Sequence, residues 1–222
     1  YDENHFKFIK SDINDLQSLF ECDYVINTAA ETHVDNSILS SDEFLHSNIN
    51  GVKHLLDLIR LKSKFKMPIL LHFSTDEVYG DIDKGSHTEE DLLKPSNPYS
   101  ATKAAADMLI TAWGRTFKVP YIIVRPTNNY GYGQYPEKLI PKICKSIILN
   151  KKVPLHNKGL PKRVWLNAKD TANAIITIIE NNENGKCLNQ IYNISGNIEL
   201  SNIEIVKKVI IQYTFVCTFR CN

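Results

Sequence analysis

Several features are scarce or missing in the 222-residue sequence, and each absence excludes a class of protein. Lys and Arg number 26 against 25 Asp and Glu, with no long block of one sign, so neither a nucleic-acid surface nor a charged membrane-binding surface is indicated. No apolar run approaches the length that crosses a bilayer, and no basic-then-apolar leader is present. The sequence therefore predicts no nucleic-acid partner and no membrane partner.

The five cysteines are too dispersed for a disulfide framework or a metal site. No C-x-x-C pair occurs, and no Cys has a neighbouring His at ligand spacing. None of the seven histidines forms a metal-binding set. Reduced thiols in such a pattern are typical of the cytoplasm. We therefore expect a cytoplasmic protein without a metal.

Glycine is missing from the first part of the chain, since the first glycine is Gly51. In dinucleotide-binding folds, the first βα unit carries a glycine-rich turn whose backbone amides support the pyrophosphate at a helix N-terminus. No such turn precedes Gly51. The sequence thus predicts a chain that begins inside a domain, without that domain's first βα unit.

Short apolar runs alternate with longer segments of helical periodicity, which favours βα units and a parallel sheet. Strands are expected at 5–9, 24–28, 68–74 and 121–125. Helices are expected at 46–61, 98–113, 136–149, 169–180 and 201–212. The fold class is therefore α/β, a doubly wound, Rossmann-like parallel sheet lacking its first βα unit. The last dozen residues, IQYTFVCTFRCN, depart from helical periodicity and predict no regular element.

The strand at 68–74 ends in Ser-Thr-Asp-Glu, which places two neighbouring carboxylates at the edge of the sheet. Ligands of open parallel sheets bind outside the carboxyl ends of the strands. Asp76 and Glu77 would point to opposite faces if the strand continued, so both can face a ligand only if the chain turns after Ser74. The simpler interpretation is that the carboxylates cap the following turn.

Tyr99 and Lys103 form a Y-x-x-x-K pair, which a helix places on one face, one turn apart. A phenol is a poor base at neutral pH because its pKa lies near 10. An adjacent ammonium favours the phenolate, so the pair can take a proton from a substrate hydroxyl. Tyr and Lys also meet at this spacing on many helices, and the upstream Ser-Thr pair is what makes the pattern specific.

Four motifs together resemble the dTDP-glucose 4,6-dehydratase family, a branch of the extended short-chain dehydrogenase/reductases and of the NAD-dependent epimerase/dehydratases. They are AAETHVDNSI, STDEVYGD, PYSATKAAAD and NNYGYGQYPEKLIP, and the resemblance runs in order from about residue 5 to residue 210. The Thr-Asp-Glu triplet separates this branch from its epimerase and decarboxylase relatives. The resemblance implies a truncated NAD-binding domain at 1–130 and a partial substrate-binding lobe at 131–222 that crosses back to the core around 163–180.

The resemblance also implies a catalytic role for each residue of the two motifs. Tyr99 would be the base at the glucose C4 hydroxyl, with Lys103 lowering its pKa and Thr75 bonding to the C4 oxygen. Glu77 would remove the C5 proton, and a protonated Asp76 would give a proton to the departing C6 hydroxyl. Thr75, Asp76, Glu77, Tyr99 and Lys103 are thus the expected catalytic residues of an NAD-dependent lyase.

NAD is the cofactor implied, with Asp12 and Ile13 beside the adenine, and Ala29, Ala30 and Thr32 beside the nicotinamide ribose and phosphates. A helix cap for Asp12 and tight packing for the alanines are equally good interpretations. Asn48 would either bond near the active site or begin a helix. The full set of implied cofactor residues is Asp12, Ile13, Ala29, Ala30, Thr32, Ser74, Tyr99 and Lys103.

The implied substrate is the nucleotide sugar dTDP-glucose, which would be bound by His33, Asn129, Glu137, Lys138 and Arg163. A planar guanidinium such as that of Arg163 can bind two diphosphate oxygens at once. The alternatives are a surface loop for His33, a solvated first helical turn for Glu137 and Lys138, and a surface charge beside Trp165 for Arg163. Tyr132 replaces the family's usual Pro, and Val164 replaces the acid or amide that commonly follows the Arg.

Two rival functions remain open in the sequence. One is a non-catalytic or regulatory fragment that keeps the fold, because the glycine-rich turn is missing. The other is a nucleotide-sugar epimerase or decarboxylase that uses Tyr99 and Lys103 without the elimination. In either case the family resemblance implies a homodimer formed through the helices at 46–61 and 98–113.

Overall fold

The computed structural model describes residues 6–62 and 66–220, which form two compact units. The first unit comprises Tyr1–Arg125 and Asn181–Asn193, and the second comprises Pro126–Glu180 and Ile194–Asn222. We expected a boundary at residue 130 and a return to the core around 163–180. Helix α6 (Ala168–Glu180) contacts strands of the second unit, and residues 181–193 belong to the first unit, while the expected boundary and return stay predictions.

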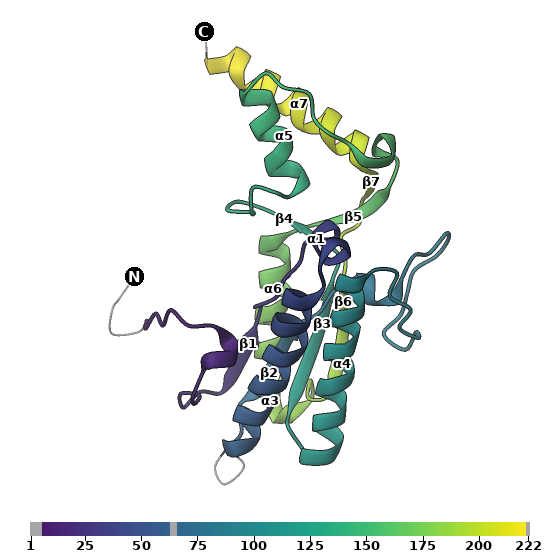
Figure 1. The fold of residues 1–222 in the computed structure, drawn as a ribbon. Coiled ribbons are helices and arrows are strands. Elements are labelled where there is room, and N and C mark those ends of the chain that lie inside the picture. Colours follow the sequence, from purple (N-terminus) through teal and green to yellow (C-terminus); the bar gives the residue numbers. More distant parts are fainter. Residues whose placement is uncertain (1–5, 63–65, 221–222) are drawn as a thin grey trace. The chain divides into compact units, whose positions relative to one another are not determined.

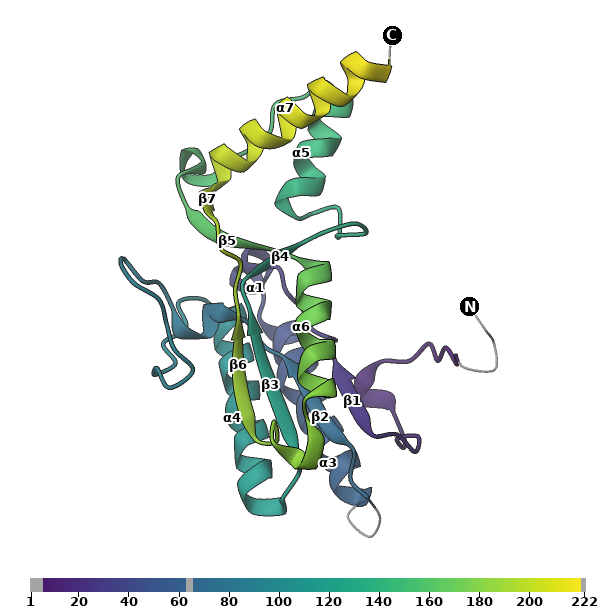
Figure 2. The same cartoon turned by 180° about the vertical axis from the view of Figure 1, so that it is seen from behind.

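A parallel sheet forms the centre of the first unit (Figures 1 and 2). Its strand order is β1-β2-β3-β6, and β2 pairs in parallel with both β1 and β3. The sheet and its flanking helices confirm the predicted Rossmann-like α/β class. The strands are β1 (Tyr24–Asn27), β2 (Ile69–Phe73), β3 (Tyr121–Pro126) and β6 (Gln190–Ile194).

The strand expected at 5–9 is wrong for the residues that the structure describes, because residues 6–9 form no regular element. A strand needs a neighbour that accepts and donates its backbone hydrogen bonds. No described strand pairs with this segment, and the side chains of Phe6, Phe8 and Ile9 are exposed. Alternating apolar residues without a partner therefore did not produce a strand.

Two long helices, α3 (Gly51–Leu61) and α4 (Pro98–Phe117), pack on the sheet of the first unit (Figure 1). Their apolar faces meet β2 and β3 in a core that includes the fully buried Leu56, Leu70 and Ile110. Burying one such side chain contributes about 1.5–3 kcal/mol. Asn97 begins α4 with a reciprocal capping box to Ser100, which fixes where the helix starts and hence where the next residues point.

A continuous helical segment leads into α3. It consists of α2 (Asp42–Phe44) and a π-helical stretch, η2 (Leu45–Asn50), which α1 (Val34–Leu39) precedes in the chain. π-helical turns are rare and occur frequently at functional sites. The helices predicted at 46–61 and 98–113 are thus confirmed, with the first one starting earlier and containing a π segment.

The second unit contains a three-stranded sheet of order β4-β5-β7 and three helices. The side chains of Ile143, Ile205 and Val206 form its core. Its last helix continues to Arg220, so our expectation of no regular element after residue 211 was wrong; extending a helix that has already formed requires little free energy. The elements are β4 (Asn128–Tyr130), β5 (Lys162–Asn167), β7 (Glu199–Ser201), α5 (Leu139–Ile148), α6 and α7 (Asn202–Arg220).

Candidate active site

The chain bends immediately after β2, as it must if Asp76 and Glu77 are to face the same ligand. The backbone of Thr75 is extended, and the 3-10 helix η4 (Asp76–Tyr79) begins directly after it. The Thr75 hydroxyl caps this turn by accepting a hydrogen bond from the Glu77 N–H at 3.3 Å. Asp76 and Glu77 therefore leave the strand and lie on the first turn of a helix, which confirms the predicted bend.

Gly80 ends the turn in a conformation that only glycine adopts readily, with φ of 84°. A side chain at this position would collide with the backbone carbonyl of Lys94. Lys94 in turn donates its N–H to the Val78 carbonyl at 3.0 Å. The loop between η4 and α4 is thereby fastened to the turn that carries the two carboxylates.

Tyr99 lies on the first turn of α4, and its side chain interacts with the turn that carries Asp76 and Glu77. Its phenol shares a hydrogen bond with the Thr75 side chain, and the charges of Glu77 and Asp76 both act on it. Burial, followed by the Glu77 charge, raises the pKa of Tyr99 above its usual value, while the bond to Thr75 opposes this rise. Thr75, Asp76, Glu77 and Tyr99 therefore form one cluster, which we call the acid turn.

Each carboxylate of the acid turn has a neutral partner. The Asn97 side-chain amide donates to Glu77 Oε2 at 3.2 Å, and the Thr75 hydroxyl is 3.3 Å from Asp76 Oδ1. Both acids are only partly buried. The two carboxylates are thus oriented by neutral donors and keep some exposure to solvent.

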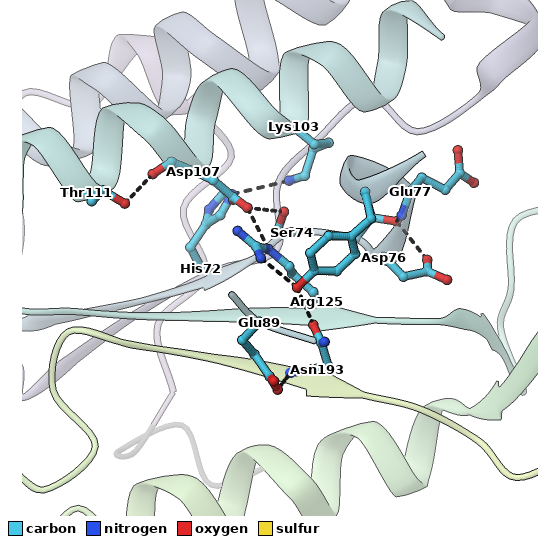
Figure 3. A network of polar contacts seen from close by, with 12 residues as sticks. His72, Ser74, Asp76, Glu77, Glu89, Lys103, Asp107, Thr111, Arg125 and Asn193 are labelled. Carbon is cyan, nitrogen blue, oxygen red and sulfur yellow. Dashed lines mark hydrogen bonds and ion pairs between the residues drawn. The ribbon is translucent and has the colours of Figure 1, made fainter. Parts of the chain in front are cut away.

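Lys103 is buried one helical turn after Tyr99 and points toward β2 (Figure 3). Its ammonium nitrogen donates to the Phe73 carbonyl at 2.6 Å and lies 3.4 Å from His72 Nε2. Burial lowers the pKa of Lys103 to about 8, although the Asp107 carboxylate opposes this change. The pKa of Tyr99 is shifted by burial and by Glu77, Thr75 and Asp76. The effect of Lys103 on Tyr99 therefore stays a prediction.

A second polar cluster lies beneath the acid turn, and sequence analysis missed it (Figure 3). Asp107 Oδ2 accepts hydrogen bonds from the Ser74 hydroxyl and from Arg125 Nε, each at 3.0 Å. Arg125 also donates to the Tyr79 hydroxyl at 2.6 Å, which itself donates to Asn193 Oδ1 at 2.8 Å. We call Ser74, Tyr79, Asp107, Arg125 and Asn193 the support network.

The support network is sealed from solvent, since Asp107 is 0% and Arg125 2% exposed. Desolvation raises the pKa of Asp107, and the Arg125 charge opposes this rise. Ser74 uses its hydroxyl here, although we expected it beside the cofactor. A signal for the network was present in the sequence, because Tyr99, Lys103 and Asp107 are spaced by four residues and must share one helix face.

The loop after β1 is held in place by Asn48 of the π-helical stretch. Asn48 exchanges two hydrogen bonds with the Glu31 backbone, at 2.9 and 3.0 Å, and donates to the Thr102 hydroxyl at 2.9 Å. The Ala29 N–H donates to Asn27 Oδ1 at 3.2 Å. Asn48 thus fixes the segment that contains Ala29, Ala30 and Thr32 beside α4.

The other predicted residues of the first unit make local contacts, of which only the cap at Asp12 was weighed as an alternative. Asp12 caps a short 3-10 helix, η1 (Ile13–Asp15), by accepting the Asn14 N–H at 2.8 Å, a bond that lowers the pKa of Asp12. Ile13 packs against Gly51, where a larger residue would collide with it. His33 is the N-cap of α1 and accepts the Asn36 N–H at 3.4 Å.

The remaining substrate candidates belong to the second unit. Asn129 on β4 bonds to the Thr171 hydroxyl and to the Thr127 carbonyl, so both ends of its amide have partners within that unit. Lys138 is the N-cap residue of α5, directly after Glu137. Arg163 on β5 is exposed and donates to the Lys162 carbonyl at 2.9 Å. Their roles toward a substrate stay predictions.

Within the described ranges, 6–62 and 66–220, no group of three or more His, Cys, Asp or Glu side chains could hold a metal ion. No helix within these ranges is both long enough and apolar enough to cross a membrane.

The sequence from residue 2 to residue 195 matches the model of the NAD dependent epimerase/dehydratase family. This chain belongs to that family. The matched residues include the acid turn, Lys103 and the support network.

Curated relatives of this family member include a probable dTDP-glucose 4,6-dehydratase of Sinorhizobium fredii, 39% identical over 221 residues. The low-salt glycan biosynthesis protein Agl12 of Haloferax volcanii is 37% identical over 213 residues. These alignments cover 92% and 94% of the chain, but only 61% and 66% of the two relatives. The chain thus spans less than two thirds of the length of these relatives.

Solved structures agree with the family membership. The dTDP-glucose 4,6-dehydratase DesIV of Streptomyces venezuelae, with NAD and DAU bound, is 33% identical and has a TM-score of 0.87. That comparison covers 94% of this chain and 64% of the enzyme. A UDP-glucuronic acid 4-epimerase of Bacillus cereus also matches with a TM-score of 0.85, but at 24% identity it shows the shared fold alone.

Proposed function

We propose that the chain carries the active site of a dTDP-glucose 4,6-dehydratase. This NAD-dependent lyase oxidises C4 of the sugar, eliminates water across C5 and C6, and reduces C6 to give dTDP-4-keto-6-deoxyglucose. The observation that supports it best is the acid turn, in which two neighbouring carboxylates and a hydroxyl share one cluster with the Tyr99 phenol. The names of the curated relatives support the same reaction.

The acid turn supplies the proton transfers that this reaction needs. Tyr99 takes the proton of the C4 hydroxyl, and Thr75, already bonded to Tyr99, holds the C4 oxygen beside it. The ketone at C4 acidifies the C5 proton, which Glu77 then removes. Asp76, in its protonated form, donates to the C6 hydroxyl as it departs as water. One carboxylate thus acts as base and its neighbour as acid in a single elimination.

The residues present fit the nicotinamide end of NAD. Lys103 donates to the Phe73 carbonyl and has a further N–H for a ribose hydroxyl. NAD, when bound, accepts the hydride from C4 and returns it to C6. Tyr99, Ser74 and the segment with Ala29, Ala30 and Thr32 would surround this end, with Asp12 and Ile13 toward the adenine.

The nucleotide half of the substrate would be bound by the second unit. Arg163 is exposed and its guanidinium can bind two diphosphate oxygens, which is the geometry that the substrate requires. Asn129, Glu137 and Lys138 would contact the remaining phosphate, sugar and base groups, with His33 of the first unit at the sugar.

We also propose a homodimer, which light scattering coupled to size exclusion would test, and a cytoplasmic location.

The test is to incubate the chain with NAD and dTDP-glucose and to search by mass spectrometry for a product lighter by one water. We expect the 4-keto-6-deoxy product from the unmodified chain and none from Tyr99→Phe, which lacks the base. Absence of product from a chain that is folded by circular dichroism would overturn the proposal and favour a non-catalytic member of the family.

A further inference from the structure

A chain of three buried polar side chains crosses the first unit and ends at Lys103, and the proposed reaction uses Lys103 but not the other two. Asn27 at the end of β1, His72 on β2 and Lys103 on α4 are 3%, 0% and 2% exposed. Asn27 Nδ2 is 3.1 Å from His72 Nδ1, and Lys103 Nζ is 3.4 Å from His72 Nε2. Both ring nitrogens of this imidazole therefore face a nitrogen.

The orientation of the Asn27 amide follows from its other partner. Its Oδ1 accepts the backbone N–H of Ala29 at 3.2 Å, and only an oxygen can accept there. The NH₂ group must then point at His72 and donate to Nδ1. A neutral imidazole carries one proton, so with Nδ1 as acceptor that proton resides on Nε2.

The proton on Nε2 points at Lys103. An ammonium group has three donors and no lone pair, so Nε2–H and an ammonium would place two donors against each other. An uncharged amine can accept this N–H and still donate to the Phe73 carbonyl. His72 does not avoid the conflict by becoming charged, because burial and the nearby Lys103 place its pKa well below its usual value.

The other ionisable groups around Lys103 do not remove this conflict. Asp107, one turn further along α4, favours the ammonium, but its Oδ2 already accepts from Arg125 and Ser74. Tyr99, one turn earlier, bonds to Thr75. Of the groups that face Lys103, His72 is thus the one that presents a donor to it.

We propose that His72 is a positioning residue which presents its Nε2–H to Lys103 and so lowers the affinity of that amine for a proton. Asn27 sets this arrangement by fixing the imidazole tautomer. The lowered pKa of Lys103 has burial as its main cause. In this proposal the facing donor acts in the same direction. In terms of the proposed function, on which this last step rests, Lys103 then gives the Tyr99 phenolate weaker positive support in the free chain.

The first test reads the tautomer directly in the unmodified chain by long-range ¹H–¹⁵N NMR of the histidine rings. The His72 signals are identified by their loss in His72→Gln. We expect Nδ1 to show the shift of an unprotonated nitrogen and Nε2 that of a protonated one. A proton on Nδ1 would overturn the proposal, whatever the activity of the chain.

Two substitutions at Asn27 provide the second test. In Asn27→Asp the carboxylate can only accept, so we expect Nδ1 of His72 to become protonated. Asn27→Leu adds no charge and releases the imidazole to turn its lone pair toward Lys103. In that variant we expect Lys103, followed by ¹⁵Nζ NMR, to bind its proton about tenfold more tightly, which is about one pKa unit.

The matched control is His54→Gln, which removes a partly buried histidine that bonds to the Leu16 carbonyl rather than to a lysine. We expect the titration of Lys103 to be unchanged in this control. An unchanged titration in Asn27→Leu as well would overturn the role of His72. Absence of dehydratase activity from the unmodified chain, together with the expected NMR result, would contradict only the proposed function.

Discussion

The acid turn and the support network both contain residues of the short segment 74–79, yet these residues have opposite environments. Thr75, Asp76 and Glu77 lie on a turn where the two acids are only partly buried, whereas Ser74 and Tyr79, on either side of them, point into a sealed network with Asp107 and Arg125. In the proposed function, the two acids exchange protons with a ligand, and the support network holds the turn in place.

The sharpest way to break this comparison is Glu77→Gln. Gln keeps the volume and can still bond to Asn97, so the free energy of unfolding should change by no more than about 0.5 kcal/mol. Because it cannot accept the C5 proton, dehydration should fall by about 10²–10⁴-fold. Oxidation at C4 should remain, detected as reduced nucleotide in a single turnover. Equal loss of both steps would contradict the roles assigned here.

Arg125→Met is the complementary change in the support network. It leaves the fully buried Asp107 carboxylate without its cationic partner, and we expect unfolding in urea to show a loss of about 3–5 kcal/mol. Lys66→Met breaks a fully exposed ion pair with Asp23 and should leave the unfolding curve unchanged. Similar losses in the two variants would mean that the network carries no special stability.

Tyr79→Phe removes a single hydroxyl from the support network and should have a smaller effect. Arg125 and Asn193 each lose a partner, so a loss of about 1–3 kcal/mol is expected in the free energy of unfolding. Tyr132→Phe, at a fully exposed position of the second unit, is the control and should unfold like the unmodified chain. No difference between the two would show that the hydroxyl is dispensable.

Lys103 lies between the two clusters, and its titration should appear in the pH dependence of stability. Its pKa is about 8 in the folded chain, against 10.5 as the usual value. Between these values the unfolded chain binds a proton that the folded chain has released, so raising the pH favours the folded state. The stability of the unmodified chain relative to Lys103→Met should therefore rise from about pH 8 to pH 10.5.

The control for that measurement is Lys151→Met, which removes one exposed lysine from the second unit. Its stability relative to the unmodified chain should not show the same rise across this range. If stability changes with pH in the same way for Lys103→Met and for the unmodified chain, the lowered pKa of Lys103 is contradicted.

The sequence predicted elements whose signal is local and missed contacts between distant segments. Periodicity located α3, α4 and three of the four expected strands. The turn at 74–79 was foreseen only as a condition for function. Asp107, Arg125 and Asn193 come from a helix and two strands, and their pairing depends on strand order, which no local pattern contains.

The same reasoning explains the error at residues 6–9 and the two interpretations that Asp12 and His33 allow. Residues 6–9 alternate like a strand, but strand formation depends on a neighbour that periodicity does not reveal. Asp12 and His33 have residue types that suit a ligand site, and each also suits the helix cap that it forms. Residue type and motif alone therefore could not decide between cap and binding site.

The central claim is that Asp76 and Glu77 converge on the Tyr99 phenol, and the titration of that phenol tests it most directly. With ¹³C-labelled tyrosine, the signal of Tyr99 can be assigned by its loss in Tyr99→Phe and followed by NMR as the pH rises. We expect the pKa of Tyr99 to lie above the usual value of 10 in the unmodified chain and to fall in Glu77→Gln, because one of the negative charges that raise it is gone. A pKa near 10 that does not respond to Glu77→Gln would contradict the account.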